Sequence, residues 1–442
     1  MRGASRVVAL LALLVASASG GRRARAQAPP PLQPDERYTI DVYQGPVIGS
    51  TRVIGLGGAY SAIAEGAVGI PFNAAAYAQR PYYSNSNFDW DFAFDFLAPG
   101  LFQDSSFDYD GNGRSSTYAD SFVVLVGGLM FQYKGFGGGL HVAAQTYDVR
   151  DASGKVFSWD LVTARLGVAY AFARHQLLVG AGIVAGIFSV DQPGTSGNQT
   201  LFSVVSSGFE VGALWRPRRW PLRAALSFRT PSLIDRRTDA CSDNCPQGFV
   251  LPARAELPWE LRAGFAYYLG AQPFNPTPRF AAPQTPAPAP PPSSPPSSRP
   301  ASRPTAATQE KLSAYEELKR SYRGGRYVAF CLDLVLVGTT RDAIGPDGLL
   351  EQVRERVGES ISLAAHLGVE SEIVARRLRA RVGSYWEAGR YADSAGRIHG
   401  TVSLSVRLFD MRVLGARSLL VAAAFDGAAR YTNLGLSIGF WH

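Results

Sequence analysis

The chain has 442 residues, a formal net charge of +8, 18% charged residues and 11% aromatic residues. Its 46 glycines and only 3 methionines suit strands and tight turns better than helices. The positive charge is spread along the chain and partly confined to residues 1–26, so it does not indicate nucleic-acid binding. Outside those residues, no uninterrupted apolar stretch reaches the roughly 18 residues that a membrane-spanning helix needs.

The first residues predict export from the cytoplasm. Arg2 and Arg6 precede an apolar run that begins at Val7 and is followed by small residues. This order of charge, apolar run and small residues is typical of a secretory signal peptide. Cleavage is possible after Ala18, but we favour cleavage after Ala26, so residues 1–26 are expected to be removed.

Residues 27–83 form an extension ahead of the first predicted strand. This extension contains Gly55, Gly57 and Gly58 within a few positions. Glycines in such a run let the backbone turn sharply or pack closely against a neighbour. The run therefore indicates either a segment packed into a confined space or an ordinary glycine-rich loop before a strand.

Strict alternation of apolar and polar residues then begins and recurs over most of the chain. In the first case, one face carries Phe88, Trp90, Phe92, Phe94 and Phe96, while the other carries Asp89, Asp91 and Asp95. A strand of a transmembrane barrel turns its apolar residues to lipid and its polar residues to the lumen. The pattern therefore predicts an all-β protein, a transmembrane antiparallel β-barrel.

We expect about fourteen strands, eight within residues 84–270 and six within residues 325–442. An even number is usual for a closed bacterial barrel. The connections after the second, fourth, sixth, tenth and twelfth predicted strands are short, as at residues 134–135 and 173–175, which places those turns and the N-terminus on the periplasmic side. The link after the thirteenth strand is short as well and departs from this rule. The candidate strands are residues 86–97, 119–132, 136–147, 159–172, 176–190, 200–215, 221–230, 259–269, 326–338, 360–369, 373–386, 399–410, 417–426 and 430–441.

Residues 271–307 interrupt the strands and are dominated by proline, alanine and serine. This composition predicts an extended, low-complexity linker, which the strand count places in the periplasm. A short amphipathic helix is expected at residues 308–324.

Charged residues that alternate with apolar residues along a predicted strand are expected to face the lumen. They could bind a carboxylate headgroup, but we expect mainly structural pairing between arginines and aspartates, because a wide polar lumen must balance its charges. The principal candidates are Asp89, Asp91, Asp95, Arg377, Arg379 and Arg381, and the further arginines are Arg165, Arg223, Arg229, Arg262 and Arg407.

Catalytic and cofactor chemistry is not predicted. The 5 histidines never fall at metal-ligand spacing, and neither a nucleophile elbow nor a zinc-protease motif is present. The run at residues 180–186 imitates a dinucleotide-binding turn, but it lacks the following helix and the acidic residue about 20 positions later. We therefore expect no enzyme activity, no metal and no cofactor.

The segment from Arg52 to Tyr60, followed by Ala64-Glu65-Gly66 and by Asn73-Ala74-Ala75, resembles the plug region of the FadL/TodX/PorV outer-membrane family. Residues 256–262 and 381–387 resemble later strands of that family. Asn73 is followed by alanine, whereas the family pattern has proline there. The resemblance implies a barrel in the bacterial outer membrane with an N-terminal plug, or hatch, built on Arg52, Gly55, Gly57, Gly58 and Asn73.

The resemblance also implies a function. The family is best known for passive uptake of hydrophobic molecules, such as long-chain fatty acids and aromatic hydrocarbons, and this is our leading hypothesis. Phe72 and Tyr77 are candidate walls of the apolar pocket that such a ligand needs. The alternative is a PorV-like interaction protein that docks secreted proteins, and a third possibility is a soluble, periplasmic all-β protein.

The three cysteines are Cys241, Cys245 and Cys331. The first two are close together in a polar stretch, and an oxidising compartment favours a disulfide between them, with two free thiols as the alternative. If the disulfide forms, denatured mature protein will show at most one thiol that reacts with a thiol reagent. Three reactive thiols would contradict the disulfide.

Overall fold

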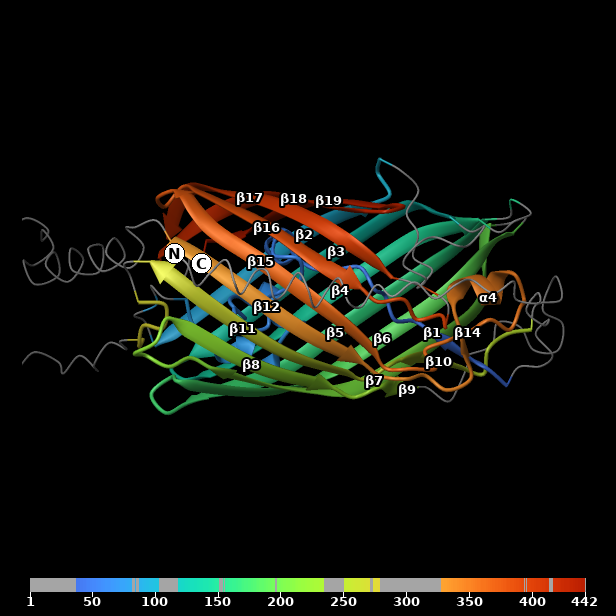
Figure 1. The fold of residues 1–442 in the computed structure, drawn as a ribbon, viewed down its shortest axis with the longest axis horizontal. Coiled ribbons are helices and arrows are strands. Elements are labelled where there is room, and N and C mark those ends of the chain that lie inside the picture. The colour runs from blue at the N-terminus through green and yellow to red at the C-terminus, as the bar shows by residue number, and fades with distance from the viewer. Residues whose placement is uncertain are drawn as a thin grey trace, which may run out of the picture.

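The computed structural model describes residues 37–81, 84, 87–102, 118–150, 154, 156–194, 197–233, 250–270, 273–278, 327–392, 394, 396–412 and 416–441. Fourteen long strands form a closed antiparallel barrel (Figure 1), because the last strand pairs with the first through Ile438 and Phe94. The predicted fold class is therefore confirmed. The barrel strands are β2 (Phe88–Pro99), β3 (Tyr118–Tyr133), β4 (Phe136–Arg150), β5 (Val156–Phe172), β6 (Leu177–Gly194), β7 (Gly197–Trp215), β8 (Leu222–Arg229), β11 (Glu260–Gly270), β12 (Tyr327–Val337), β15 (Ser362–Val374), β16 (Leu378–Glu387), β17 (Arg397–Arg412), β18 (Ala416–Ala428) and β19 (Tyr431–Phe440).

The two ends of the barrel differ. One end, here named the turn end, carries the short connections at residues 134–135, 173–176 and 375–377. The other, the loop end, carries the short helix α4 (Pro346–Leu350) and a group of short strands (Figure 1). The expected signal peptide, most of the expected linker 271–307 and the expected helix 308–324 lie outside the described residues.

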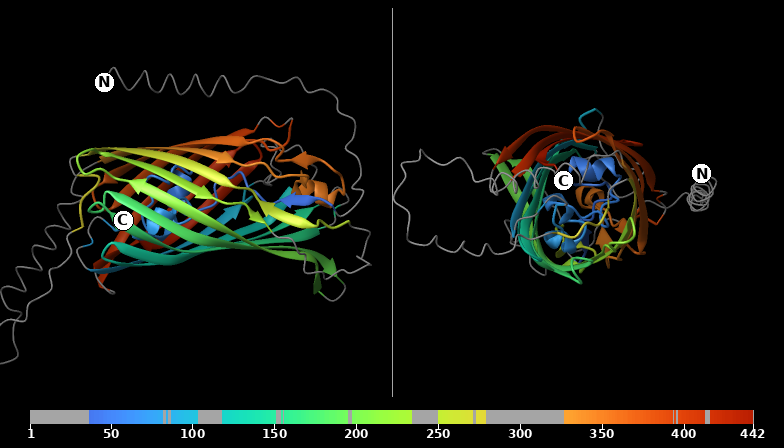
Figure 2. Two further views of the ribbon diagram at one scale, coloured as in Figure 1. Left: turned by 90° about the horizontal axis from the view of Figure 1, so that it is seen from below. Right: turned by 90° about the vertical axis from the view of Figure 1, so that its left-hand side faces the viewer.

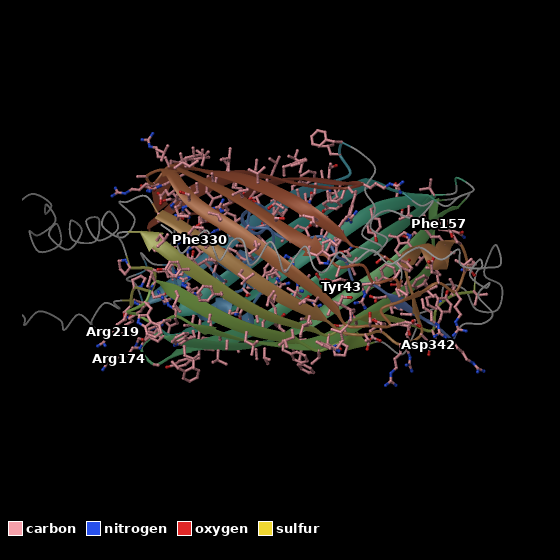
Figure 3. All side chains as sticks on the ribbon, viewed as in Figure 1. Tyr43, Phe157, Arg174, Arg219, Phe330 and Asp342 are labelled. Atoms are coloured by element: carbon pink, nitrogen blue, oxygen red, sulfur yellow. The ribbon has the colours of Figure 1, made fainter. Side chains whose placement is uncertain are left out.

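The outward face of the barrel is apolar. Figure 3 shows side chains projecting from the outside of the wall, and near the turn end many are exposed aromatic rings, as a transmembrane barrel places at its membrane interface. A soluble protein would bury this surface, so the third possibility does not fit. The exposed side chains include Leu129, Leu140, Leu166, Ile183, Phe209, Leu226, Leu334, Leu363, Val382, Leu404 and Leu436, and the turn-end rings include Tyr133, Phe136, Tyr170, Phe172, Trp215 and Trp220.

One predicted turn is misplaced. The sequence analysis ends a strand at residue 369 and begins the next at 373, whereas β15 continues to Val374 and β16 begins at Leu378. Glu370 and Glu372, which lie in the predicted turn, are buried on the inward face of β15. Arg377 therefore lies in the turn and is exposed, so its expected place in the lumen is wrong.

A small group of short strands at the loop end was not predicted. β1 (Thr39–Asp41) runs parallel to β10 (Arg254–Leu257) and to β13 (Ala343–Ile344). β9 (Ser232–Leu233) pairs with β10, and β14 (Arg356–Val357) pairs with β13. These strands are two to four residues long, too short for an alternating pattern to reveal them.

Residues 42–80, here named the lumenal segment, run from β1 at the loop end to β2, which begins at the turn end. The end-on view in Figure 2 shows this N-terminal part of the chain inside the barrel. The segment contains α2 (Thr51–Gly55) and two 3-10 helices, η1 (Ala67–Gly69) and η2 (Ala74–Ala78). None of the described helices is long and apolar enough to cross a membrane.

The glycine-rich run at residues 180–186 makes room for the lumenal segment. A Cβ atom at Gly180 would overlap the carbonyl oxygen of Ala74. The first glycine of the run therefore lets η2 approach the barrel wall closely, which explains a pattern that imitates a nucleotide-binding turn.

Leu166 projects outward near the middle of β5 and is 61% exposed in the isolated chain. Leu166→Arg should lower the free energy of unfolding from lipid vesicles by about 2–4 kcal/mol, because arginine is disfavoured on the lipid face of a barrel near the membrane midplane. Urea titration followed by tryptophan fluorescence measures the change. The matched variant Leu166→Met should stay close to wild type; equal stability of all three proteins would contradict a lipid-facing position.

Candidate functional site

Arg52 joins the lumenal segment to the wall. Its Nε and Nη2 donate to the two carboxylate oxygens of Glu370 on β15, at 2.9 and 3.0 Å. Its Nη1 donates to Tyr60 Oη and Glu65 Oε2, each at 3.1 Å. This two-point contact between guanidinium and carboxylate is the strongest common form of ion pair, so Arg52 fixes α2 against the wall.

The two carboxylates that bind Arg52 have further partners on the wall. Glu370 also accepts from Arg381 Nε at 2.6 Å and from Tyr327 Oη at 2.7 Å. Glu65 accepts from Arg223 Nη1 of β8 at 3.1 Å. The charged groups are mostly buried, so each of them depends on these partners in place of water.

The glycine run after α2 passes close to the wall. Gly57 has φ +60, and a Cβ atom there would lie 2.9 Å from backbone atoms of Leu367 and Ser384. A side chain at this position would therefore meet both an unfavourable conformation and a clash. Gly55 and Gly58 similarly face Ser403 and His366, so the three predicted glycines lie where the segment contacts β15, β16 and β17.

Asn73 organises the second half of the lumenal segment. Its Oδ1 accepts from the amide of Ala75 at 2.9 Å and so caps η2. Its Nδ2 donates to the carbonyl oxygens of Ser61 and of Ala213 on β7, at 3.2 and 3.1 Å. These contacts do not require a proline at position 74, where this sequence has alanine.

The three predicted aspartates of β2 are buried on its inward face, as expected of lumen-facing residues. Asp91 accepts from the amide of Ala67 at 2.6 Å, Asp95 accepts from the amide of Thr51 at 3.1 Å, and Asp89 forms an ion pair with Arg417.

Six of the predicted arginines pair with carboxylates on the barrel wall or in the lumenal segment. Arg379 stacks on Trp441 with 3.9 Å between the guanidinium carbon and the ring centroid, and Arg407 pairs with Asp410 near the turn end. The remaining pairs are Arg165 with Glu210, Arg223 with Glu65, Arg229 with Glu260, Arg262 with Glu260 and Asp333, and Arg381 with Glu370.

The first residues after β11 close the turn end beneath the lumenal segment. Asn275 is buried, and its Nδ2 donates to the carbonyl oxygens of Pro217 and Leu222 at 2.9 and 2.8 Å. Phe274 lies against the Arg223 guanidinium, 3.9 Å from ring centroid to guanidinium carbon. The described beginning of the predicted linker is therefore packed into the turn end of the barrel.

Arg216, in the connection after β7, makes further contacts that close the turn end of the barrel. Its Nη1 donates to Gln79 Oε1 at 2.5 Å and its Nη2 to the carbonyl oxygen of Pro276 at 2.9 Å. Burial, reinforced by nearby Arg223, lowers the pKa of Arg216 to about 9. Arg216 therefore remains charged at neutral pH and joins the lumenal segment to the chain after β11.

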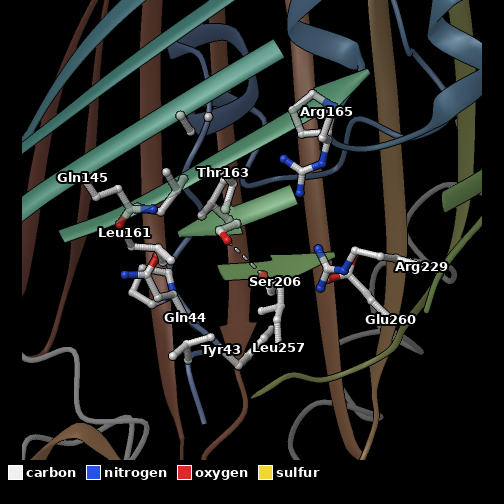
Figure 4. A pocket seen from close by; sticks show the side chains of 18 of the residues that line it. Tyr43, Gln44, Gln145, Leu161, Thr163, Arg165, Ser206, Arg229, Leu257 and Glu260 are labelled. Carbon is white, nitrogen blue, oxygen red and sulfur yellow. Dashed lines mark hydrogen bonds and ion pairs between the residues drawn. The ribbon is translucent and has the colours of Figure 1, made fainter. Parts of the chain in front are cut away.

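A cavity of about 170 Å³ lies between residues 42–49, here named the strap, and the barrel wall (Figure 4). Its polar side includes Gln145, Arg165, Arg229 and Glu260, which Figure 4 shows around the open space. Its apolar side consists of Ile48, Phe72, Val126, Leu161, Phe188, Val204 and Leu257. The cavity is amphipathic and lies inside the barrel.

Sequence analysis found part of this cavity. Arg165, Arg229, Arg262 and Phe72 were predicted to face the lumen or a pocket, and all four line it. Tyr77 is buried in η2 but does not line it. The predicted disulfide partners, Cys241 and Cys245, lie outside the described residues, so that prediction stays untested, while Cys331 is a buried free cysteine.

Several inward side chains were missed because they are apolar. Near the loop end, β5, β6 and β7 turn Phe157, Trp159, Phe188 and Phe202 into the lumen, where they are buried in a single core. Around Trp159 the alternation is reversed: Phe157 and Trp159 point inward and alternate with the polar Ser158 and Asp160, so the rule that apolar residues face lipid assigns them to the wrong side. The only available signal was the high aromatic content of these strands.

Comparisons with known proteins concern the fold. No family model matches the sequence, and no curated protein matches it. The structure is similar to a FadL homologue from Pseudomonas aeruginosa, with a TM-score of 0.53 and 10% identity over 90% of this chain and 99% of that chain. This likeness confirms the expected FadL-like fold, and with so few identical residues it shows the fold alone.

Two further solved structures are less similar to this chain. The CymD monoaromatic hydrocarbon channel has a TM-score of 0.47 and 11% identity, over 89% of this chain and 96% of that chain. The toluene transporter TodX from Pseudomonas putida has a TM-score of 0.46 and 10% identity, over 92% of this chain and 99% of that chain.

Arg52→Ala should loosen the lumenal segment. The change leaves Glu370 and Glu65 without their shared cation, and breaking a buried ion pair costs about 3–5 kcal/mol. Amide hydrogen exchange in α2 should therefore become faster by several orders of magnitude. Arg407→Ala, which removes the cation paired with the exposed Asp410 near the turn end, serves as the control. Unchanged exchange in Arg52→Ala would show that the ion pairs do not hold α2.

Proposed function

We propose that this chain is an outer-membrane channel for passive uptake of hydrophobic small molecules. The observation that carries the proposal is the partly apolar cavity inside a barrel whose outside is also apolar. Affinity would come from apolar ligand surface that leaves water for the cavity. The turn end would face the periplasm and the loop end the cell exterior, since such barrels have short periplasmic turns.

In this proposal, the lumenal segment acts as the plug that the sequence predicts. Its backbone and side chains bond to wall residues on β2, β7, β8, β12 and β15, including Asp333, which accepts from the amides of Tyr60 and Ser61 at 3.2 and 3.0 Å. Passage from the cavity to the turn end therefore requires part of the segment to move.

The alternative role in protein secretion depended on the linker at residues 271–307. Most of that linker lies outside the described residues, and its described beginning is packed into the turn end instead of extending to a partner. The secretion hypothesis therefore stays a prediction from the sequence, and transport is the function that the site supports better.

A reversible crosslink tests movement of the plug. Thr51 Oγ1 and Ser437 Oγ are 2.6 Å apart, so the double variant Thr51→Cys/Ser437→Cys brings two thiols together across the interface between α2 and β19. In cells that depend on this chain for uptake of radiolabelled toluene or oleate, oxidation should reduce the rate to that of cells without the chain. Reduction should restore it.

The single variants Thr51→Cys and Ser437→Cys are the controls, because neither can form the crosslink. Their uptake should not respond to oxidation. If the oxidised double variant, with the crosslink verified by mass spectrometry, takes up both probes at the wild-type rate, then the lumenal segment does not gate passage.

A further inference from the structure

The cavity beside the strap is small and partly open. Its volume is about 170 Å³. A protein cavity of roughly 150 Å³ holds a benzene molecule, so this space fits a single six-membered ring with a small substituent. Because the cavity is partly open, a long alkyl chain would extend beyond it and would not be enclosed by its walls.

The apolar side of the cavity suits a ring. Phe72 of the lumenal segment and Phe188 of β6 both line it, with Leu161 and Val204 from the neighbouring strands. Aromatic rings in contact prefer edge-to-face or offset stacking, which adds about 0.5–1.5 kcal/mol to the effect of area burial. An aromatic ligand would therefore gain more from this wall than an aliphatic ligand of the same volume.

The polar side of the cavity contains hydrogen-bonding atoms that have no partner among the described residues. They are Gln145 Oε1, His141 Nδ1 and Arg229 Nε, and all three residues line the cavity. Gln145 and His141 are 5% and 3% exposed. Buried polar atoms are nearly always bonded, so these atoms point to a polar group or water in the cavity.

The charges around the cavity are already balanced. Arg165 lies 3.4 Å from Glu210, Arg229 lies 3.4 Å from Glu260, and Arg262 lies 3.1 Å from Glu260 and 3.5 Å from Asp333. Three guanidinium groups thus face three carboxylates. A ligand carboxylate would add an uncompensated buried charge, which is strongly unfavourable, and it has no proton to donate to Gln145 Oε1.

We propose that the cavity binds a monocyclic aromatic molecule with one neutral hydrogen-bonding substituent, such as a phenol or a benzyl alcohol. The ring lies against Phe72 and Phe188, and the hydroxyl donates to Gln145 Oε1, which has no partner among the described residues. A hydroxyl both donates and accepts, which suits a wall with both kinds of atom. This inference rests on the proposed function and names its ligand class.

Equilibrium binding to the purified full-length protein tests the proposal. The probes are p-cresol, toluene, p-toluate and dodecanoate, measured by calorimetric titration in a detergent without an aromatic group. We expect p-cresol to bind about tenfold more tightly than toluene, which corresponds to one hydrogen bond of roughly 1.4 kcal/mol, and p-toluate to bind more weakly than either.

A matched pair of variants locates the site. Gln145→Leu removes a polar partner while keeping a similar volume, so it should reduce the affinity for p-cresol about tenfold and leave the affinity for toluene unchanged or higher. Gln176→Leu, in a turn far from the cavity, should change neither. If Gln145→Leu lowers the affinity for p-cresol and for toluene by the same factor, the substitution has disturbed the cavity wall. That result would overturn the assigned hydrogen bond.

The other outcomes separate this inference from the proposed function. Tighter binding of toluene, p-toluate or dodecanoate than of p-cresol would overturn the ligand class. Failure of all four probes to bind, while cells still take up toluene or oleate through the chain, would show a cavity that holds water only. Absence of any chain-dependent uptake would count against the channel itself.

Discussion

The central constraint on this structure is that the charges turned away from lipid enter a lumen that is filled with protein. A strand with an apolar outer face must direct its polar residues inward. Here the lumenal segment occupies that space, so an inward charge meets protein where a wide channel would supply water. Each buried charge then needs a partner, because an uncompensated one is very unfavourable. Arg52 with Glu370 and Arg223 with Glu65 are direct consequences.

The same constraint determines the path of the lumenal segment. A backbone folded into short helical turns leaves amide groups without internal partners. Wall carboxylates supply acceptors for several of them: Asp91 for Ala67, Asp95 for Thr51, and Asp333 for Tyr60 and Ser61. Glycines such as Gly180 and Gly57 then permit the close approach that these bonds need. The wall sequence thus specifies the position of the segment as well as its own strands.

The difference between the wall strands and their contacts with the lumenal segment explains which features could be predicted from the sequence. Strands have a local period of two, so their number and most positions could be predicted from residues that are neighbours in sequence. The ion pairs could not, because Arg52 and Glu370 are 318 positions apart and nothing in the pattern links them. The alternation also misleads where its sense is reversed: Phe157 and Trp159 alternate with Ser158 and Asp160, but here the apolar residues face the lumen and not lipid. Gln145 and His141 were not singled out either, because the strap that lines the cavity with them is distant in sequence.

The energies also indicate which part of the lumenal segment a ligand can move. Burying a single ring of roughly 150–250 Å² at about 25 cal/mol per Å² contributes about 4–6 kcal/mol. Breaking one buried ion pair costs about 3–5 kcal/mol, and α2 and Glu65 together hold three linked pairs. A ligand can shift a conformational equilibrium only by its differential affinity, so one ring cannot release α2. The strap at residues 42–49 carries no charged side chain, and its displacement breaks none of these pairs. We therefore expect binding to involve the strap, and passage beyond the cavity to depend on rarer, thermally driven openings of α2.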